Sequence, residues 1–126
     1  MALCGGTSLK DFSGLGKLPF WIFHGTADRA VSIQQSKRVV DKLQSTNNDS
    51  RLRYTWFQGG NHGMPVHVFY LRKTYEWLFS HSLLDKDRTV NRDIDISAAD
   101  FRRTSKDMRS GLAQPLIIDG PSLGNY

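Results

Sequence analysis

One short stretch, LPFWIFHGTAD at residues 18–28, constrains the fold more than any other part of the sequence. Its apolar residues 18–23 run without alternation, which is typical of a strand covered on both faces of a parallel sheet. Pro19 lies near the start of this strand, where a missing backbone donor does the least harm. The strand leads into a His-Gly turn that ends at Asp28. We therefore predict an α/β protein in which a buried strand delivers a carboxylate to one edge of its sheet.

An amphipathic helix is predicted after this turn. Ser32 and Gln35 have the spacing of a capping box, which marks the first turn of a helix. The stripe of residues that follows at helical spacing predicts the buried face; it consists of Ile33, Ser36, Val39, Val40 and Leu43. The polar loop at residues 46–50 ends this helix by about Ser45, because its side chains compete for backbone hydrogen bonds.

A second strand and a second helix are predicted next. Residues 52–57 alternate in a two-residue period, and the glycine-rich stretch GGNHG at residues 59–63 breaks the strand. A helix is expected at about residues 66–81, with one face formed by Val66, Phe69, Tyr70, Thr74, Trp77 and Leu78. The order strand, helix, strand, helix predicts a parallel α/β sheet.

Two chemically active side chains follow the two predicted strands. Asp28 comes after the first strand and His62 after the second, so both should lie at the carboxyl edge of the sheet. A carboxylate beside an imidazole is the orienting half of a hydrolytic triad. We predict that Asp28 orients His62 and that His62 is a general base.

The residues around this pair resemble the C-terminal part of α/β-hydrolase superfamily enzymes. The resemblance is carried by residues 19–31, 54–63 and 75–78, and it covers about residues 2–83. It is nearest to the branch of dienelactone-hydrolase-like, prolyl-oligopeptidase-like and carboxylesterase-like enzymes. It implies a partial α/β-hydrolase fold over residues 1–84, with the last parallel strands and the C-terminal helix. It also implies that Asp28 and His62 belong to a Ser-Asp-His triad acting on carboxylic ester or peptide bonds.

A nucleophile elbow of the form G-x-S-x-G is absent from the sequence. Ser8 and Cys4 lie in sequences that resemble this motif in part but lack the flanking strand or helix that the elbow requires. Residues 1–4 resemble the end of the strand that follows the elbow unit. We therefore expect a C-terminal piece of a serine hydrolase whose nucleophile lies outside this chain, and which is inactive alone. The alternative is a non-catalytic α/β interaction module that uses an exposed sheet edge.

The composition changes beyond the second helix. Charges dominate residues 85–109, and the apolar residues able to dock there are Ile94, Ile96, Phe101 and Met108. We predict that residues 85–126 form an irregular charged extension or linker, partly disordered. Residues 115–121 could add one short strand.

Composition restricts the partners and cofactors. The net charge is +5, but the basic residues are interspersed with acids, so no nucleic-acid footprint is predicted. No apolar run is long enough to cross a membrane, and one cysteine excludes an internal disulfide framework. No cofactor or metal is predicted, because a set of Asp28, His62 and His67 is a weak signal. His24 is predicted to support the turn that carries Asp28. The aromatic residues are predicted to form the core. An unpaired edge of the sheet is expected to allow self-association.

Overall fold

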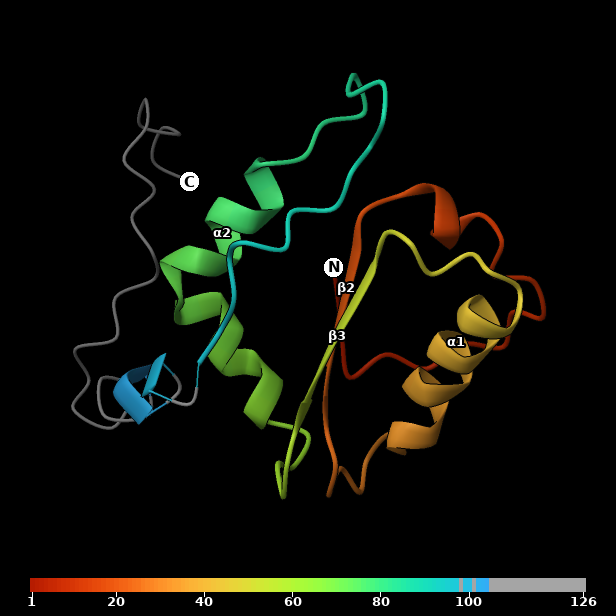
Figure 1. The fold of residues 1–126 in the computed structure, drawn as a ribbon. Helices are drawn as coiled ribbons and strands as arrows, with labels where there is room; N and C mark the ends of the chain where they lie inside the picture. Colours follow the sequence, from red (N-terminus) through yellow and green to blue (C-terminus); the bar gives the residue numbers. More distant parts are fainter. Residues whose placement is uncertain (98, 101, 105–126) are drawn as a thin grey trace, which may run out of the picture.

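The computed structural model describes residues 1–97, 99, 100 and 102–104. Its elements (Figure 1) are, in chain order, β1 (Ala2–Leu3), the 3₁₀ helix η1 (Leu15–Lys17), β2 (Phe20–Gly25), α1 (Ile33–Ser45), β3 (Leu52–Phe57), the 3₁₀ helix η2 (Met64–Tyr70) and α2 (Arg72–Phe79). No helix in this part of the chain is long and apolar enough to span a bilayer. The predicted roles of Phe101, Met108 and residues 115–121 concern positions outside the described residues.

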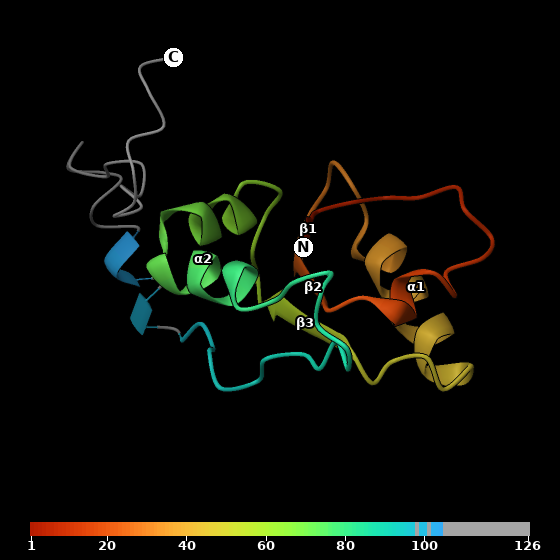
Figure 2. The ribbon, with the colours of Figure 1, turned by 90° about the horizontal axis from the view of Figure 1, so that it is seen from above.

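The three strands form one parallel sheet in the order β1-β2-β3. Ile22 lies at its centre, in register with Ala2 on one side and Tyr54 on the other. Every residue of β2 after the first is buried, and the prediction of a strand covered on both faces is confirmed. Helix α1 covers one face, and η2 with α2 covers the other (Figure 2). The arrangement is a partial α/β-hydrolase fold, as the sequence predicted.

Alternate residues of β2 supply two separate cores. The core under α1 consists of Phe12, Ile22, Val39, Val40, Leu43 and Leu52. The core under α2 consists of Trp21, Phe23, Val68, Trp77 and Val90. The indole rings of Trp21 and Trp77 meet edge to face, with 5.1 Å between centroids. Both tryptophans are core residues, in agreement with the prediction.

Helix α1 forms as the sequence predicts. It spans Ile33–Ser45, and the hydroxyl of Ser32 accepts a hydrogen bond from the backbone N–H of Gln34 at its first turn. Four of the five residues of the predicted stripe are buried, namely Ser36, Val39, Val40 and Leu43.

The prediction of one continuous helix over residues 66–81 is wrong. The segment divides into η2 and α2 at Leu71, whose backbone is extended. Every third residue is buried, namely Pro65, Val68, Leu71, Thr74 and Trp77. In η2 this is the period of a 3₁₀ helix, so Val66 and Phe69 of the predicted face are exposed. In α2 the predicted Thr74 and Trp77 are buried, whereas Leu78 is exposed.

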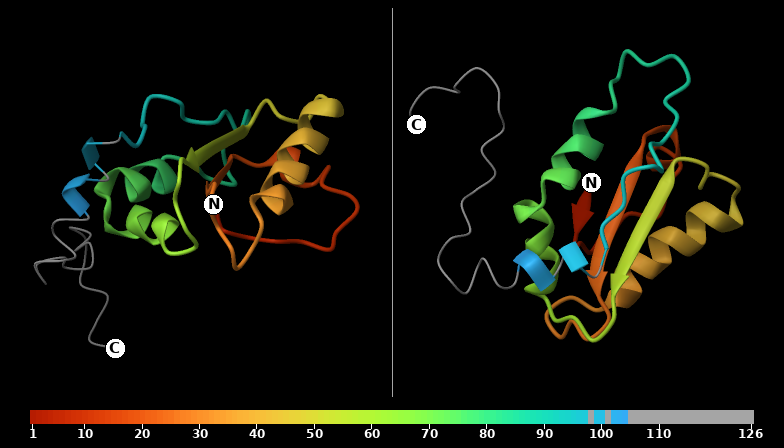
Figure 3. Two further views of the ribbon diagram at one scale, coloured as in Figure 1. Left: turned by 90° about the horizontal axis from the view of Figure 1, so that it is seen from below. Right: turned by 60° about the vertical axis from the view of Figure 1, so that its left-hand side comes forward.

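The segment that follows α2 first loops away from the sheet and then runs back along it (Figure 3, right). Val90 is buried in the second core, and Ile94 and Ile96 pack against that core. The guanidinium of Arg53 lies 3.8 Å from the centroid of a Trp21 ring. It also donates hydrogen bonds to backbone carbonyls of this segment. Sequence reasoning expected the two isoleucines to dock and overlooked Val90. That residues 85–126 form a separate extension stays a prediction.

Replacing Arg53 with alanine should loosen this segment. The variant loses charge-assisted hydrogen bonds and a cation–π contact, so we expect the free energy of unfolding to fall by about 2 kcal/mol. The matched control is Arg72→Ala, whose exposed pair with Glu76 should contribute less than about 1 kcal/mol. Urea denaturation measures both, and equal losses would contradict the assignment.

Candidate active site

The turns after β2 and β3 are joined by hydrogen bonds. Thr26 donates its N–H to the carbonyl of Phe57 at 3.0 Å, and Ala27 donates to the carbonyl of Gly60 at 2.9 Å. The N–H of Gly59 donates to the hydroxyl of Thr26 at 2.7 Å. These bonds continue the parallel ladder past the strand ends, so the two turns are held in fixed positions at one edge of the sheet.

Glycine is required where the turns approach most closely. A Cβ at Gly25 would lie 2.2 Å from the carbonyl oxygen of Gly60, closer than any non-bonded contact allows. Gly59 has a φ of 70°, a left-handed conformation that glycine adopts without strain. Glycine thus allows a close approach of the two turns at Gly25 and a left-handed bend at Gly59.

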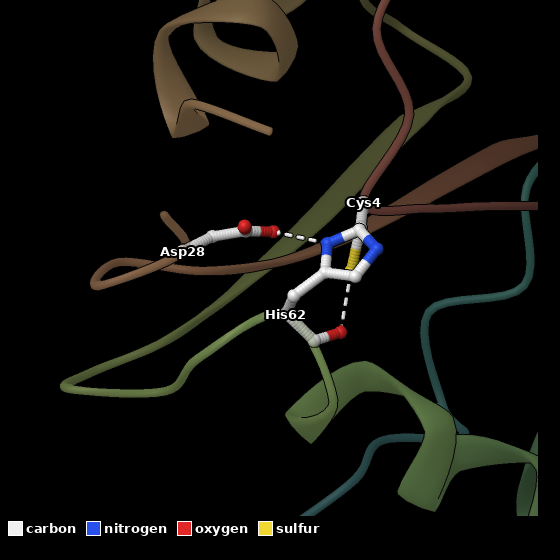
Figure 4. A group of neighbouring side chains, drawn as sticks. All are labelled: Cys4, Asp28 and His62. Carbon is white, nitrogen blue, oxygen red and sulfur yellow. Dashed lines mark hydrogen bonds and ion pairs between the residues drawn. The ribbon is translucent and has the colours of Figure 1, made fainter. Parts of the chain in front are cut away.

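The turns bring Asp28 and His62 together (Figure 4). Nδ1 of His62 lies 2.8 Å from Oδ2 of Asp28. The other carboxylate oxygen accepts hydrogen bonds from the backbone N–H groups of Ala30 and Val31, at 2.8 and 2.9 Å. The Asp28 side chain is fully buried, whereas 52% of the His62 side chain is exposed. The sequence therefore predicted the meeting of these two side chains.

His24 supports the acid turn, as the sequence predicted. Its Nε2 lies 2.9 Å from the carbonyl of Val31 and 3.2 Å from Oδ2 of Asp28. Both partners are acceptors, so Nε2 carries a hydrogen and donates. Its Nδ1, 2.7 Å from the Ser36 hydroxyl, can then accept from that hydroxyl. His24 is fully buried and connects the acid turn to α1.

The environment keeps the Asp28 carboxylate ionised. Burial raises the pKa of this carboxyl group, but hydrogen bonds from Val31, His62 and Ala30 outweigh burial and lower the pKa from 3.8 to about 2. Four donors surround the two oxygens, so the carboxylate cannot rotate without losing hydrogen bonds. A fixed negative charge beside Nδ1 holds the His62 imidazole in one orientation.

The other ring nitrogen of His62 is available for chemistry. Nε2 points away from Asp28 (Figure 4), and among the described residues it has no hydrogen-bond partner. An open depression adjoins this side chain, lined by Ala27, Arg29, Ala30, Asn61, His62 and Gly63. A group that enters the depression can therefore reach the imidazole.

Cys4 is the member of this site that sequence reasoning did not place. It follows β1, its N–H donates to the carbonyl of Phe23, and its thiol lies 3.4 Å from the carbonyl of His62. The candidate ligand atoms of Cys4, Asp28 and His62 all lie within 4.8 Å of one another. Its position directly after a parallel strand was the available signal. Among the described residues, these three lie close enough together to hold a metal ion, and no such set includes His67.

Neither Cys4 nor Ser8 stands on a nucleophile elbow. No helix follows them within residues 5–14, and Ser8 is exposed on that irregular segment. Burial and the nearby Asp28 carboxylate raise the pKa of the Cys4 thiol, which disfavours the thiolate that a cysteine nucleophile needs. The structure thus offers an acid and a base but no serine elbow in the part of the chain that it describes.

The parallel sheet and the acid–histidine pair are features of an α/β-hydrolase. The family model of the prolyl oligopeptidase family matches residues 9–85, which is more than half of the chain. The chain therefore belongs to the prolyl oligopeptidase family, a family of serine hydrolases in the α/β-hydrolase superfamily. Searches of curated proteins and of solved structures gave no match.

A methyl group at position 25 should separate the two turns. Gly25→Ala places its Cβ against the backbone of Gly60, so we expect it to destabilise the fold by about 1–3 kcal/mol. Thermal unfolding followed by circular dichroism measures the loss. Gly14→Ala is the control, since a Cβ there meets nothing within 4 Å. Equal stability of the two variants would contradict the close approach.

The ionised Asp28 should make stability depend on pH in acid. Its pKa is lower in the folded state than in the unfolded chain, so its contribution is complete above about pH 4 and is lost as the pH falls through about 2. We expect Asp28→Asn to remove part of this dependence in urea denaturation at several pH values. Asp100 also has a pKa of about 2 and retains its own share of the slope in that variant. An identical slope in the parent and in Asp28→Asn would exclude the assignment.

Proposed function

We propose that this chain supplies the acid Asp28 and the base His62 of a Ser-Asp-His triad in a serine hydrolase that cleaves carboxylic ester or peptide bonds. The observation that carries this proposal is the 2.8 Å contact between a fully buried carboxylate and a half-exposed imidazole. Membership of the prolyl oligopeptidase family supports it and favours peptide bonds over esters. We also propose that the enzyme belongs to the branch of dienelactone-hydrolase-like, prolyl-oligopeptidase-like and carboxylesterase-like enzymes.

In this mechanism the two side chains act on a proton. His62 donates its Nδ1–H to Asp28, so the lone pair of neutral imidazole lies on Nε2. Nε2 takes the proton of a serine hydroxyl as that oxygen attacks the scissile carbonyl carbon. It then gives the proton to the leaving amine or alcohol. Asp28 stays ionised throughout and stabilises the imidazolium.

The nucleophile is proposed to come from outside this chain. The sequence contains no G-x-S-x-G elbow, and β1 lies at one edge of the described sheet. Further parallel strands, one of them carrying the elbow, could add at that edge. We propose accordingly that residues 1–84 are the C-terminal part of a larger hydrolase domain, and that the substrate binds beside His62 where Arg29 contributes a positive charge.

The chain alone should be inactive. Incubated with a serine-directed fluorophosphonate and an activated ester, it should be neither labelled nor show turnover. The DNA upstream of Met1 should encode an in-frame strand followed by G-x-S-x-G, and the longer protein should be labelled. In that longer protein, His62→Ala should lower kcat by about four orders of magnitude, since the nucleophile loses its base.

The control for this experiment is His67→Ala. His67 lies on η2, where its Nδ1 contacts the hydroxyl of Thr104, so its loss should leave kcat nearly unchanged. Labelling of the isolated chain at Ser8 would overturn the proposal. Unchanged hydrolysis in His62→Ala would also contradict it.

One alternative function has an observation in its favour. Within the described residues β1 pairs with β2 alone, so the edge of β1 could add a strand of another copy or partner. This interaction module would form a defined oligomer in sedimentation, unaffected by His62→Ala. An interaction module is not expected to hydrolyse the ester. The measurement of kcat in the longer protein therefore distinguishes the two functions.

A further inference from the structure

We propose that Cys4, Asp28 and His62 form a binding site for one thiophilic divalent cation of the Zn²⁺ type. The three residues come from the ends of three adjacent parallel strands, so they are distant in sequence and close in space (Figure 4). The binding itself does not depend on the proposed hydrolase activity. If the chain is part of a hydrolase as proposed, the ion binds to Asp28 and His62, the acid and the base of the triad.

The separations between the ligand atoms suit a small ion. Zn²⁺ forms bonds of about 2.0–2.3 Å in tetrahedral geometry, which places its ligand atoms about 3.3–3.6 Å apart. Here the three atoms lie within 4.8 Å of one another. Nδ1 of His62 is 2.8 Å from Asp28, a hydrogen bond that opens, with release of the Nδ1 proton, when the ion enters. Movements of about an ångström therefore bring the set to coordination distances. His62 can make them because half of its side chain is exposed.

The chemistry of the ligand set selects the kind of metal. A thiolate and an imidazole favour Zn²⁺ and its thiophilic relatives, whereas Mg²⁺ and Ca²⁺ require sets of oxygen ligands. Three protein ligands leave the fourth position of a tetrahedral ion for water, which can arrive from the open depression beside His62.

The groups behind the ligands hold two of them in position. Asp28 accepts hydrogen bonds from Ala30 and Val31 on its other oxygen, and Nε2 of His24 lies 3.2 Å from Oδ2. Such outer hydrogen bonds orient ligands in metal sites. Cys4 is fixed by its N–H bond to the carbonyl of Phe23 and by a left-handed backbone with φ 47°.

A divalent ion would lie between the Cys4 sulfur and the Asp28 carboxylate and attract both. Metal bound there displaces the thiol proton, as in other thiolate sites. No other group of three such side chains comes together in the described residues.

The test is a titration of the purified, metal-free chain with Zn²⁺ by calorimetry and with Co²⁺ by absorption spectroscopy. We expect one equivalent to bind, and the Co²⁺ form to show a thiolate-to-metal charge-transfer band. Cys4→Ser and His62→Ala should each weaken binding by about ten-fold or more, and Cys4→Ser should abolish the band. Circular dichroism verifies that each variant is folded.

The matched control is His67→Ala, which removes a histidine outside the cluster and should bind like the parent. Binding without a charge-transfer band, or equal binding by Cys4→Ser, would overturn the proposal. Because the readout requires no turnover, its failure leaves the hydrolase proposal standing. Conversely, an inactive longer enzyme leaves this site standing.

Discussion

The parallel pairing of β2 with β3 is the constraint on which the rest of the structure depends. It places both following turns at one edge, and the lack of a side chain at Gly25 lets them approach closely enough for backbone hydrogen bonds. Asp28 and His62 occupy fixed points on these turns. The geometry of the candidate site is therefore a consequence of strand register and of one position where only a hydrogen atom fits.

The Asp28 carboxylate links the site to the interior. Backbone N–H groups of its own turn and the buried His24 hold it on one side, and the exposed His62 uses it on the other. His24 in turn contacts Ser36, so helix α1 supports the acid turn through two hydrogen bonds. A change in the packing of α1 can thus alter the position of the His62 imidazole without contacting it. The Cys4 thiol follows β1 and completes the proposed binding site for a thiophilic cation.

Strong local patterns made much of this predictable. The uninterrupted apolar run of β2 and the stripe of α1 identify buried faces directly, and two strand-end turns in a parallel sheet must share an edge. The segment after β3 was not predictable in the same way, because burial at Pro65, Val68 and Leu71 follows a 3₁₀ period. Val90 was missed because its burial depends on tertiary contacts and not on a local pattern. It belongs to a core cluster with Trp21 and Trp77, and Trp21 lies far away in sequence. The resemblance placed residues 1–4 at the end of a strand, but the position of Cys4 beside His62 depends on the register of that two-residue strand, which periodicity cannot detect.

The most direct measurement of the central claim is a long-range ¹H–¹⁵N NMR spectrum of the four histidine rings. If Asp28 accepts a hydrogen bond from His62, the neutral His62 ring carries its hydrogen on Nδ1, and Asp28→Asn shifts the population toward the Nε2–H tautomer. A His62 ring that carries its hydrogen on Nε2 in the parent protein, and does not respond to Asp28→Asn, would contradict the account.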